Sequence, residues 1–132
     1  MKKAKKILAC TFCLMVIMVV FAFAVDSESV DITSSDRVAR SSGQVTAKSV
    51  VFSGNNNAIS TRSLYVLPQY KNSNDNWVNG DATEMLIQPN FQFSDISCAT
   101  TFTSNKYWRM ELNPYGINTK GCTGSGTVTK LT

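Results

Sequence analysis

The chain contains no histidine, and this absence excludes several kinds of chemistry. Ser-His-Asp and Cys-His catalysis need an imidazole, and so do the imidazole-ligated metal sites. A strong charge of one sign is also missing from most of the chain. Four of the 13 basic residues lie among the first six residues, so the remainder of the chain carries nine basic and nine acidic residues. A balanced chain without a basic run does not attract nucleic acid, and we expect no such partner.

The first 24 residues are typical of a signal peptide. A basic start is followed by an apolar run from Ile7 to Ala24, and small residues stand at Ala22 and Ala24. Signal peptidase requires small side chains at those two positions, so we expect cleavage after Ala24 and a mature chain that begins at Val25. An uncleaved anchor is the alternative, because 18 apolar residues are close to the minimum for spanning a bilayer. The layout is typical of a bacterial protein that is secreted and that meets a membrane only through this segment.

The cysteines divide in the same way as the charges. Cys10 and Cys13 belong to the leader, whereas Cys98 and Cys122 remain in the mature chain. An even number of cysteines in an exported chain favours a disulfide, which would close the loop between these two residues. Two thiols that act in redox chemistry or metal binding are the alternative, although the spacing is not that of a CxxC motif.

The mature chain has two parts. Residues 25–43 are polar and rich in serine, and such a stretch buries too little apolar area to fold alone, which predicts a flexible linker. Residues 44–132 are rich in Val, Thr, Phe, Tyr and Ile, with turn residues at regular spacing. This pattern predicts an all-β domain: a small antiparallel β-sandwich or barrel of about six strands.

Alternation of apolar and polar residues marks the individual strands. The expected strands are residues 45–53, 58–67, 83–88, 91–103, 106–112 and 127–131. Gly54 to Asn57 has turn composition, and Pro68 ends the second strand because it lacks an N–H group. Residues 71–82 form a polar loop with a turn at Asn79-Gly80. A shift of the alternation at Ser94-Asp95 predicts a β-bulge, and Trp108 belongs to the core.

Four aromatic residues are the candidates for ligand binding: Tyr70, Trp77, Tyr107 and Tyr115. Three stand in or beside predicted loops, and Tyr107 alternates with the core residue Trp108. Exposed aromatic rings offer a flat apolar surface with a polar group, which suits sugar rings and protein partners. The alternative is that Trp77 closes one end of the core and the tyrosines pack along sheet edges.

The remaining polar residues permit little catalysis. A glycosidase needs two carboxylates across a cleft, and no spacing pairs the candidates Asp75, Asp81, Glu84, Asp95 and Glu111. We place Glu111 on a solvated sheet face beside Arg109. The loop residues Asn72, Asn74, Asp75, Asn76 and Asp81 offer oxygen ligands, but the glycine and glutamate of a calcium-binding EF-hand loop are missing. We expect no metal and no cofactor.

The sequence therefore favours a secreted, non-enzymatic binding domain whose partner is an extracellular protein or a glycan. One alternative is a bacteriocin-like antagonist that acts on neighbouring cells, although the chain has no cationic amphipathic segment. Another is a small carboxylate-based hydrolase of glycans.

Overall fold

The structure, a computed structural model, describes residues 26–57, 62–80, 85–98 and 101–131. The predicted signal peptide lies outside these residues. The described residues form ten β-strands and no helix, so the expectation of an all-β fold is confirmed. The strands are β1 (Ser27–Ile32), β2 (Ala39–Arg40), β3 (Val45–Ala47), β4 (Val50–Asn56), β5 (Leu64–Lys71), β6 (Trp77–Asn79), β7 (Met85–Ile87), β8 (Phe91–Ser97), β9 (Lys106–Pro114) and β10 (Gly124–Lys130).

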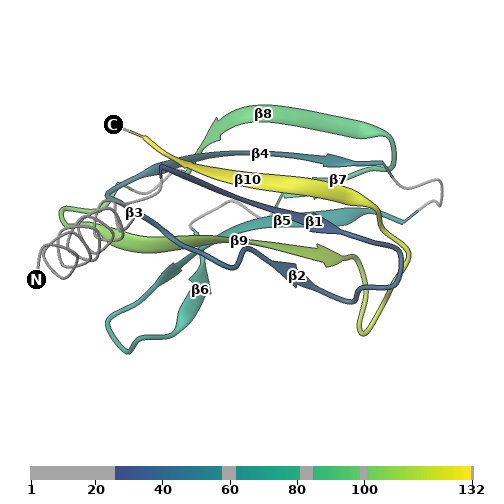
Figure 1. Cartoon of the computed structure of the whole chain (residues 1–132), viewed down its shortest axis with the longest axis horizontal. Helices are drawn as coiled ribbons and strands as arrows, with labels where there is room; N and C mark the ends of the chain where they lie inside the picture. The colour runs from purple at the N-terminus through teal and green to yellow at the C-terminus, as the bar shows by residue number, and fades with distance from the viewer. Residues whose placement is uncertain (1–25, 58–61, 81–84, 99–100, 132) are drawn as a thin grey trace, which may run out of the picture.

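The strands make two antiparallel sheets that face each other across the core (Figure 1). Sheet A has the order β1-β10-β4-β8. Sheet B has the order β2-β9-β5-β6, with β3 paired to β9 and β7 paired to β5. The two sheets do not close into one barrel. Of the two architectures expected from the sequence, the chain therefore adopts the sandwich. The chain passes from sheet B to sheet A at Lys48-Ser49, between β3 and β4.

Strand β9 supplies the centre of the core. Its side chains alternate, and Trp108, Met110 and Leu112 point inward with no exposed surface. Burial of one such side chain contributes about 1.5–3 kcal/mol to folding. The indole N–H of Trp108 donates a hydrogen bond of 3.0 Å to the carbonyl of Ala47, which satisfies its polar atom. The assignment of Trp108 to the core is therefore confirmed.

Residues 25–43 do not form the flexible linker that their composition predicts. Strand β1 pairs with β10 along its whole length, from Ser27 opposite Thr129 to Ile32 opposite Gly124. Ile32 is buried in the core, and β2 pairs with β9. The prediction is wrong because a strand at a sheet edge is stabilised by main-chain hydrogen bonds, which polar side chains also permit. The folded domain therefore includes β1 and β2.

Two turn predictions around β4 and β5 are also wrong. Gly54 to Asn56 continue β4, and β5 runs through Pro68, whose ring is fully buried. The carbonyl of Pro68 accepts a hydrogen bond of 2.7 Å from the N–H of Gly80. The main-chain atoms of Pro68 therefore face the β6 side of β5, away from β9. The missing N–H of proline therefore removes no hydrogen bond to β9.

The predicted polar loop is shorter than residues 71–82. Trp77 and Asn79 lie in β6, which pairs with the end of β5 to make a hairpin. The loop proper is Asn72 to Asn76, with Asp75 in the left-handed region at φ 63°. The predicted turn at Asn79-Gly80 is therefore not found.

The predicted β-bulge is confirmed. Phe93 pairs with Gly54 and Ile96 pairs with Phe52, so two residues of β8, Ser94 and Asp95, oppose one residue of β4. The apolar side chains on both sides of the bulge pack against the core, as the shifted alternation requires.

The predicted disulfide is not formed, although Cys98 and Cys122 are both buried. The N–H of Cys98 donates to the carbonyl of Val50, the first residue of β4. Cys122 lies beyond the other end of this strand, because the carbonyl of the following Thr123 accepts from the N–H of Asn57. Six residue steps of a strand span about 20 Å, whereas a disulfide needs Cα atoms within about 7 Å. The two cysteines are therefore at opposite ends of sheet A.

Candidate functional site

The four predicted binding aromatics do not converge on one site. Tyr70 points inward, where its ring lies 4.7 Å from the ring of Phe102 and 5.4 Å from that of Trp108. Tyr107 is half exposed on the outer face of β9, and Tyr115 is exposed beyond the other end of this strand. Tyr70 is thus a residue of the core edge, and Tyr107 and Tyr115 are separated by the length of β9.

Trp77 lies on the outer face of sheet B, and cations cover its ring. The guanidinium of Arg109 is 4.3 Å from the ring centroid, and the ammonium of Lys71 is 5.5 Å away. Arg109 also donates a hydrogen bond of 2.9 Å to Gln69. Burial, and then the charge of Arg40, lowers the pKa of Arg109. Trp77 is therefore part of a cation–π cluster that joins β5, β6 and β9 on the outer face of sheet B.

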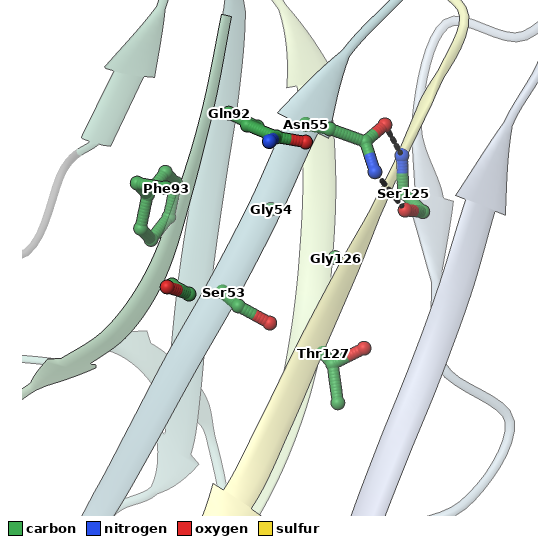
Figure 2. A pocket seen from close by; sticks show the side chains of 9 residues that line it. Ser53, Gly54, Asn55, Gln92, Phe93, Ser125, Gly126 and Thr127 are labelled. Carbon is green, nitrogen blue, oxygen red and sulfur yellow. Dashed lines mark hydrogen bonds between the residues drawn. The ribbon is translucent and has the colours of Figure 1, made fainter.

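A hollow of about 380 Å³ lies on the opposite side of the molecule, on the outer face of sheet A (Figure 2). Its lining residues come from three neighbouring strands, namely Ser53, Gly54, Asn55, Gln92, Phe93, Ser94, Ser125, Gly126 and Thr127. Adjacent strands align them in cross-strand rows. One row is Gln92, Asn55 and Ser125, and the next contains Ser53 and Thr127 beside the bulge of β8. We refer to this hollow as the sheet A groove.

A pair of glycines shapes the groove from behind. Gly54 and Gly126 are cross-strand partners that point toward the core. A Cβ atom on Gly54 would lie 3.0 Å from Val66, and one on Gly126 would lie 2.8 Å from Leu112. The missing side chains therefore let sheet A approach sheet B at this point, and the outer face is hollowed accordingly. The bulge of β8 bends the neighbouring strand and forms one wall of the groove.

The groove combines ordered and unused hydrogen-bonding groups. The amide of Asn55 donates to the hydroxyl of Ser125 at 2.7 Å and accepts from its N–H at 3.1 Å, which fixes the Asn55 rotamer (Figure 2). One N–H and one lone pair of this amide then remain for a ligand. Within the described part of the chain, the side chains of Ser53, Gln92 and Ser94 make no hydrogen bond. The groove thus offers one ordered amide–hydroxyl pair and further hydroxyl and amide groups that a ligand can contact.

The lining of the groove carries no ionisable side chain. Asp31 of β1 extends the row beyond Ser125 and is exposed at the sheet edge. Nothing is described of the side chain of Asp95, which lies in the bulge. The arrangement can therefore bind a neutral polar ligand, but the described lining supplies no acid and no base for catalysis.

The carboxylates considered for catalysis lie away from the groove. Glu111 is on the outer face of sheet B as predicted, but it is buried rather than solvated, and it accepts a hydrogen bond of 2.7 Å from Arg40. Asp75 is exposed in the loop between β5 and β6, and Asp81 and Glu84 lie outside the described residues. No carboxylate pair faces a cleft among the residues whose side chains are described.

The loop considered for calcium uses its oxygen atoms internally. The side-chain oxygen of Asn72 accepts the N–H groups of Asn74 and Asn76, each at 3.0 Å. Over the described ranges, no group of three metal-ligating side chains comes together, and no helix is long and apolar enough to cross a membrane.

Sequence reasoning missed the sheet A groove because its residues have no individual signature. Serine, threonine, asparagine and glycine in Phe52-Ser-Gly-Asn-Asn56 and Gly124-Ser-Gly-Thr127 indicate turns when each segment is considered alone. A glycine between two polar residues occurs in both segments, as Ser53-Gly54-Asn55 and Ser125-Gly126-Thr127, and was the available signal.

Comparison of the chain with protein-family models, curated proteins and solved structures found no match. Function is therefore inferred from the geometry of the groove and from the sequence.

Proposed function

We propose that this chain is a secreted, non-enzymatic binding module that holds a glycan in the sheet A groove. The observation that carries this proposal is a hollow whose described lining offers hydroxyl and amide groups and no charged side chain. Sugars present many hydroxyl groups and no charge, so a neutral set of donors and acceptors matches them without the cost of desolvating an ion.

The size and order of the groove support the same conclusion. A volume of about 380 Å³ lies at the lower end of the range for small-molecule sites, about 300–1,000 Å³. The fixed Asn55–Ser125 pair reduces the side-chain entropy that a ligand must remove.

Export is the second part of the proposal, and its support is the sequence of the leader. A protein that leaves a bacterial cell meets glycans of its own wall, of neighbouring cells and of a host. The non-enzymatic part of the proposal is supported by the described lining of the groove, which holds no carboxylate and no thiol.

The proposal is tested by a glycan screen, followed by titration calorimetry on the best glycan. Gln92 has no hydrogen bond within the described protein, so Gln92→Ala removes only a ligand contact. We expect Gln92→Ala and Asn55→Ala each to weaken binding about tenfold, the value of one or two lost hydrogen bonds. Asn79→Ala is the matched control, because Asn79 is an exposed amide on sheet B.

Two outcomes would contradict the proposal. The first is the absence of binding across a broad set of neutral glycans. The second is a glycan whose affinity is unchanged by both groove variants and is reduced by the control.

A further inference from the structure

We propose that the loops at the end of the sandwich opposite the C-terminus form a docking surface for an anionic phospholipid bilayer. This surface is separate from the sheet A groove and does not depend on the proposed function. We refer to it as the distal tip. It consists of residues 33–38, 62–63, 88–91 and 115–123.

Strand pairing places these segments together. Ile32 pairs with Gly124, Gly124 with Asn56, and Asn56 with Phe91, so the end of β1 and the starts of β10 and β8 coincide. In sheet B, Pro114 at the end of β9 pairs with Leu64. Figure 1 shows the turn after β9 and the link from β1 to β2 at one end of the molecule, with the C-terminus at the other.

Direct contacts join these loops. Arg62 donates a hydrogen bond of 3.2 Å to the carbonyl of Tyr115, and the ring of Tyr115 lies 5.7 Å from that of Tyr65. Lys120 acts electrostatically on Asp36 across the tip. The loops therefore form one surface.

Exposed apolar side chains concentrate at this tip. Six large apolar or aromatic residues are exposed in the described part of the chain, and four of them belong to the tip. They are Val38 at 36%, Phe91 at 64%, Tyr115 at 56% and Ile117 at 93% exposure. Single exposed apolar residues are ordinary, but a group of them at one end marks an interaction surface.

The turn that carries Ile117 is rigid. The hydroxyl of Thr119 lies within hydrogen-bond distance of three carbonyl oxygens, those of Pro114, Tyr115 and Gly116. Gly116 has φ 113° and Asn118 has φ 53°, both in the left-handed region. The turn thus holds the side chain of Ile117 outward, almost fully in water. This exposure costs free energy, which contact with an apolar phase would recover.

The charges of the tip identify the partner. The tip loops carry three cationic side chains and one carboxylate, namely Arg37, Arg62, Lys120 and Asp36. The four apolar side chains of the tip project from separate segments of the chain. A fluid bilayer receives such projections without a matching shape. Ile and Phe enter the acyl region, Tyr lies at the interface, and Lys and Arg contact the lipid phosphates.

Quenching of tryptophan fluorescence by brominated phospholipids tests the proposal on the full-length chain. Ile117→Trp places a reporter on the tip, and Tyr107→Trp places one on exposed β9 surface at the opposite end. With anionic vesicles we expect quenching of Ile117→Trp well beyond that of the wild type, and none beyond the wild type for Tyr107→Trp. Because the reporter shows where position 117 lies, any membrane contact by the leader does not produce the expected result.

A second measurement tests the contributions of charge and apolar contact. Protein recovered from the medium, with its N-terminus defined by intact mass, is floated with vesicles of phosphatidylglycerol and phosphatidylcholine. We expect Ile117→Asp to reduce vesicle binding at least tenfold, and Lys120→Ala about fivefold. Tyr107→Ser is the control that leaves binding unchanged. Thermal unfolding confirms that each variant is folded.

Equal quenching at positions 107 and 117, or none at either, overturns the proposal. So does vesicle binding that Ile117→Asp leaves intact. If the wild type does not bind anionic vesicles, a lipid surface is excluded and a protein partner becomes the occupant to test.

Discussion

Substitution of Gly126 by alanine tests the close approach of the two sheets. The added Cβ would lie 2.8 Å from Cδ2 of Leu112 and 3.0 Å from Cγ of Met110. Carbon atoms normally approach to about 3.5–4.0 Å, so the overlap is about 0.7 Å. Leu112 and Met110 have no exposed surface, so neither side chain can move into solvent.

The expected loss of stability follows from two opposing terms. Overpacking of a core by one methyl group costs about 1–3 kcal/mol. The reduced freedom of the unfolded chain returns about 0.4–1 kcal/mol when glycine becomes alanine. We therefore expect Gly126→Ala to lower the free energy of unfolding by about 1–2 kcal/mol, which corresponds to a decrease in Tm of about 5–10 °C.

Urea denaturation followed by tryptophan fluorescence measures this change, with two comparison variants. Gly124→Ala is expected to cost more, because its Cβ would meet the main-chain oxygen of Asn55, which cannot rotate away. Ser53→Ala changes the outer face of the same sheet, where no hydrogen bond is lost, and is expected to stay within about 0.5 kcal/mol. A Gly126→Ala variant as stable as the wild type would refute the reasoning, because the sheets could not then be in contact at this point.

Three further predictions concern single side chains. Trp108→Phe leaves the carbonyl of Ala47 without its donor and creates a small cavity, so unfolding measured by urea should become easier by about 2–4 kcal/mol. Burial raises the pKa of the Cys122 thiol, so alkylation at pH 8, read by peptide mass, should be slow in the native protein and fast in urea; rapid native alkylation would contradict the described burial. Main-chain and side-chain hydrogen bonds from Thr33 lower the pKa of Asp36 below its ordinary value of 3.8. The Asp36 carboxylate therefore stabilises the folded protein above pH 3.8, and this stabilisation is lost as the pH falls through the lowered pKa of the folded state. The difference in Tm between wild type and Asp36→Asn should accordingly shrink between pH 7 and pH 2, and a constant difference would show that the charge is not responsible.

Local sequence patterns predicted those parts of the fold that depend only on the residues of a single strand. The alternation within residues 106–112 predicted strand β9 and placed Trp108 in the core, where Met110 and Leu112 share its inward face. The bulge at Ser94-Asp95 was also visible, because an extra residue shifts the period of two wherever both flanks are apolar.

The errors occurred where partners distant in the chain decide the structure. Polar β1 is ordered by β10, and the bonded hydroxyls of Ser29 and Thr127 are separated by 98 positions. Pro68 is tolerated inside β5 because its main-chain atoms face Gly80 rather than β9, so the absent N–H removes no hydrogen bond to β9. Neither fact can be derived from the residues nearby.

The candidate site illustrates the same limit. Tyr70, Trp77, Tyr107 and Tyr115 were selected by residue type, but type does not tell which face of which sheet receives each ring. Trp77 was paired with cations instead of a ligand, because Arg109 is its neighbour only after three strands have assembled. The groove was missed because its polar residues act only as a set.

Strands β4 and β10 lie at the centre of the groove, and their alternate residues point to opposite faces of sheet A. One set of residues therefore determines the shape of the groove, and the other determines its polar groups. Gly54 and Gly126 face the core, and the absence of their side chains sets how closely the sheets approach and how deep the groove is. Ser53, Asn55 and Thr127 face outward and set which polar groups line the groove. Because the outward residues share no core contact with the inward ones, we expect their substitution to change the polar lining with little loss of stability. Substitution of an inward glycine must change both properties together, since a Cβ that separates the sheets also makes the groove shallower.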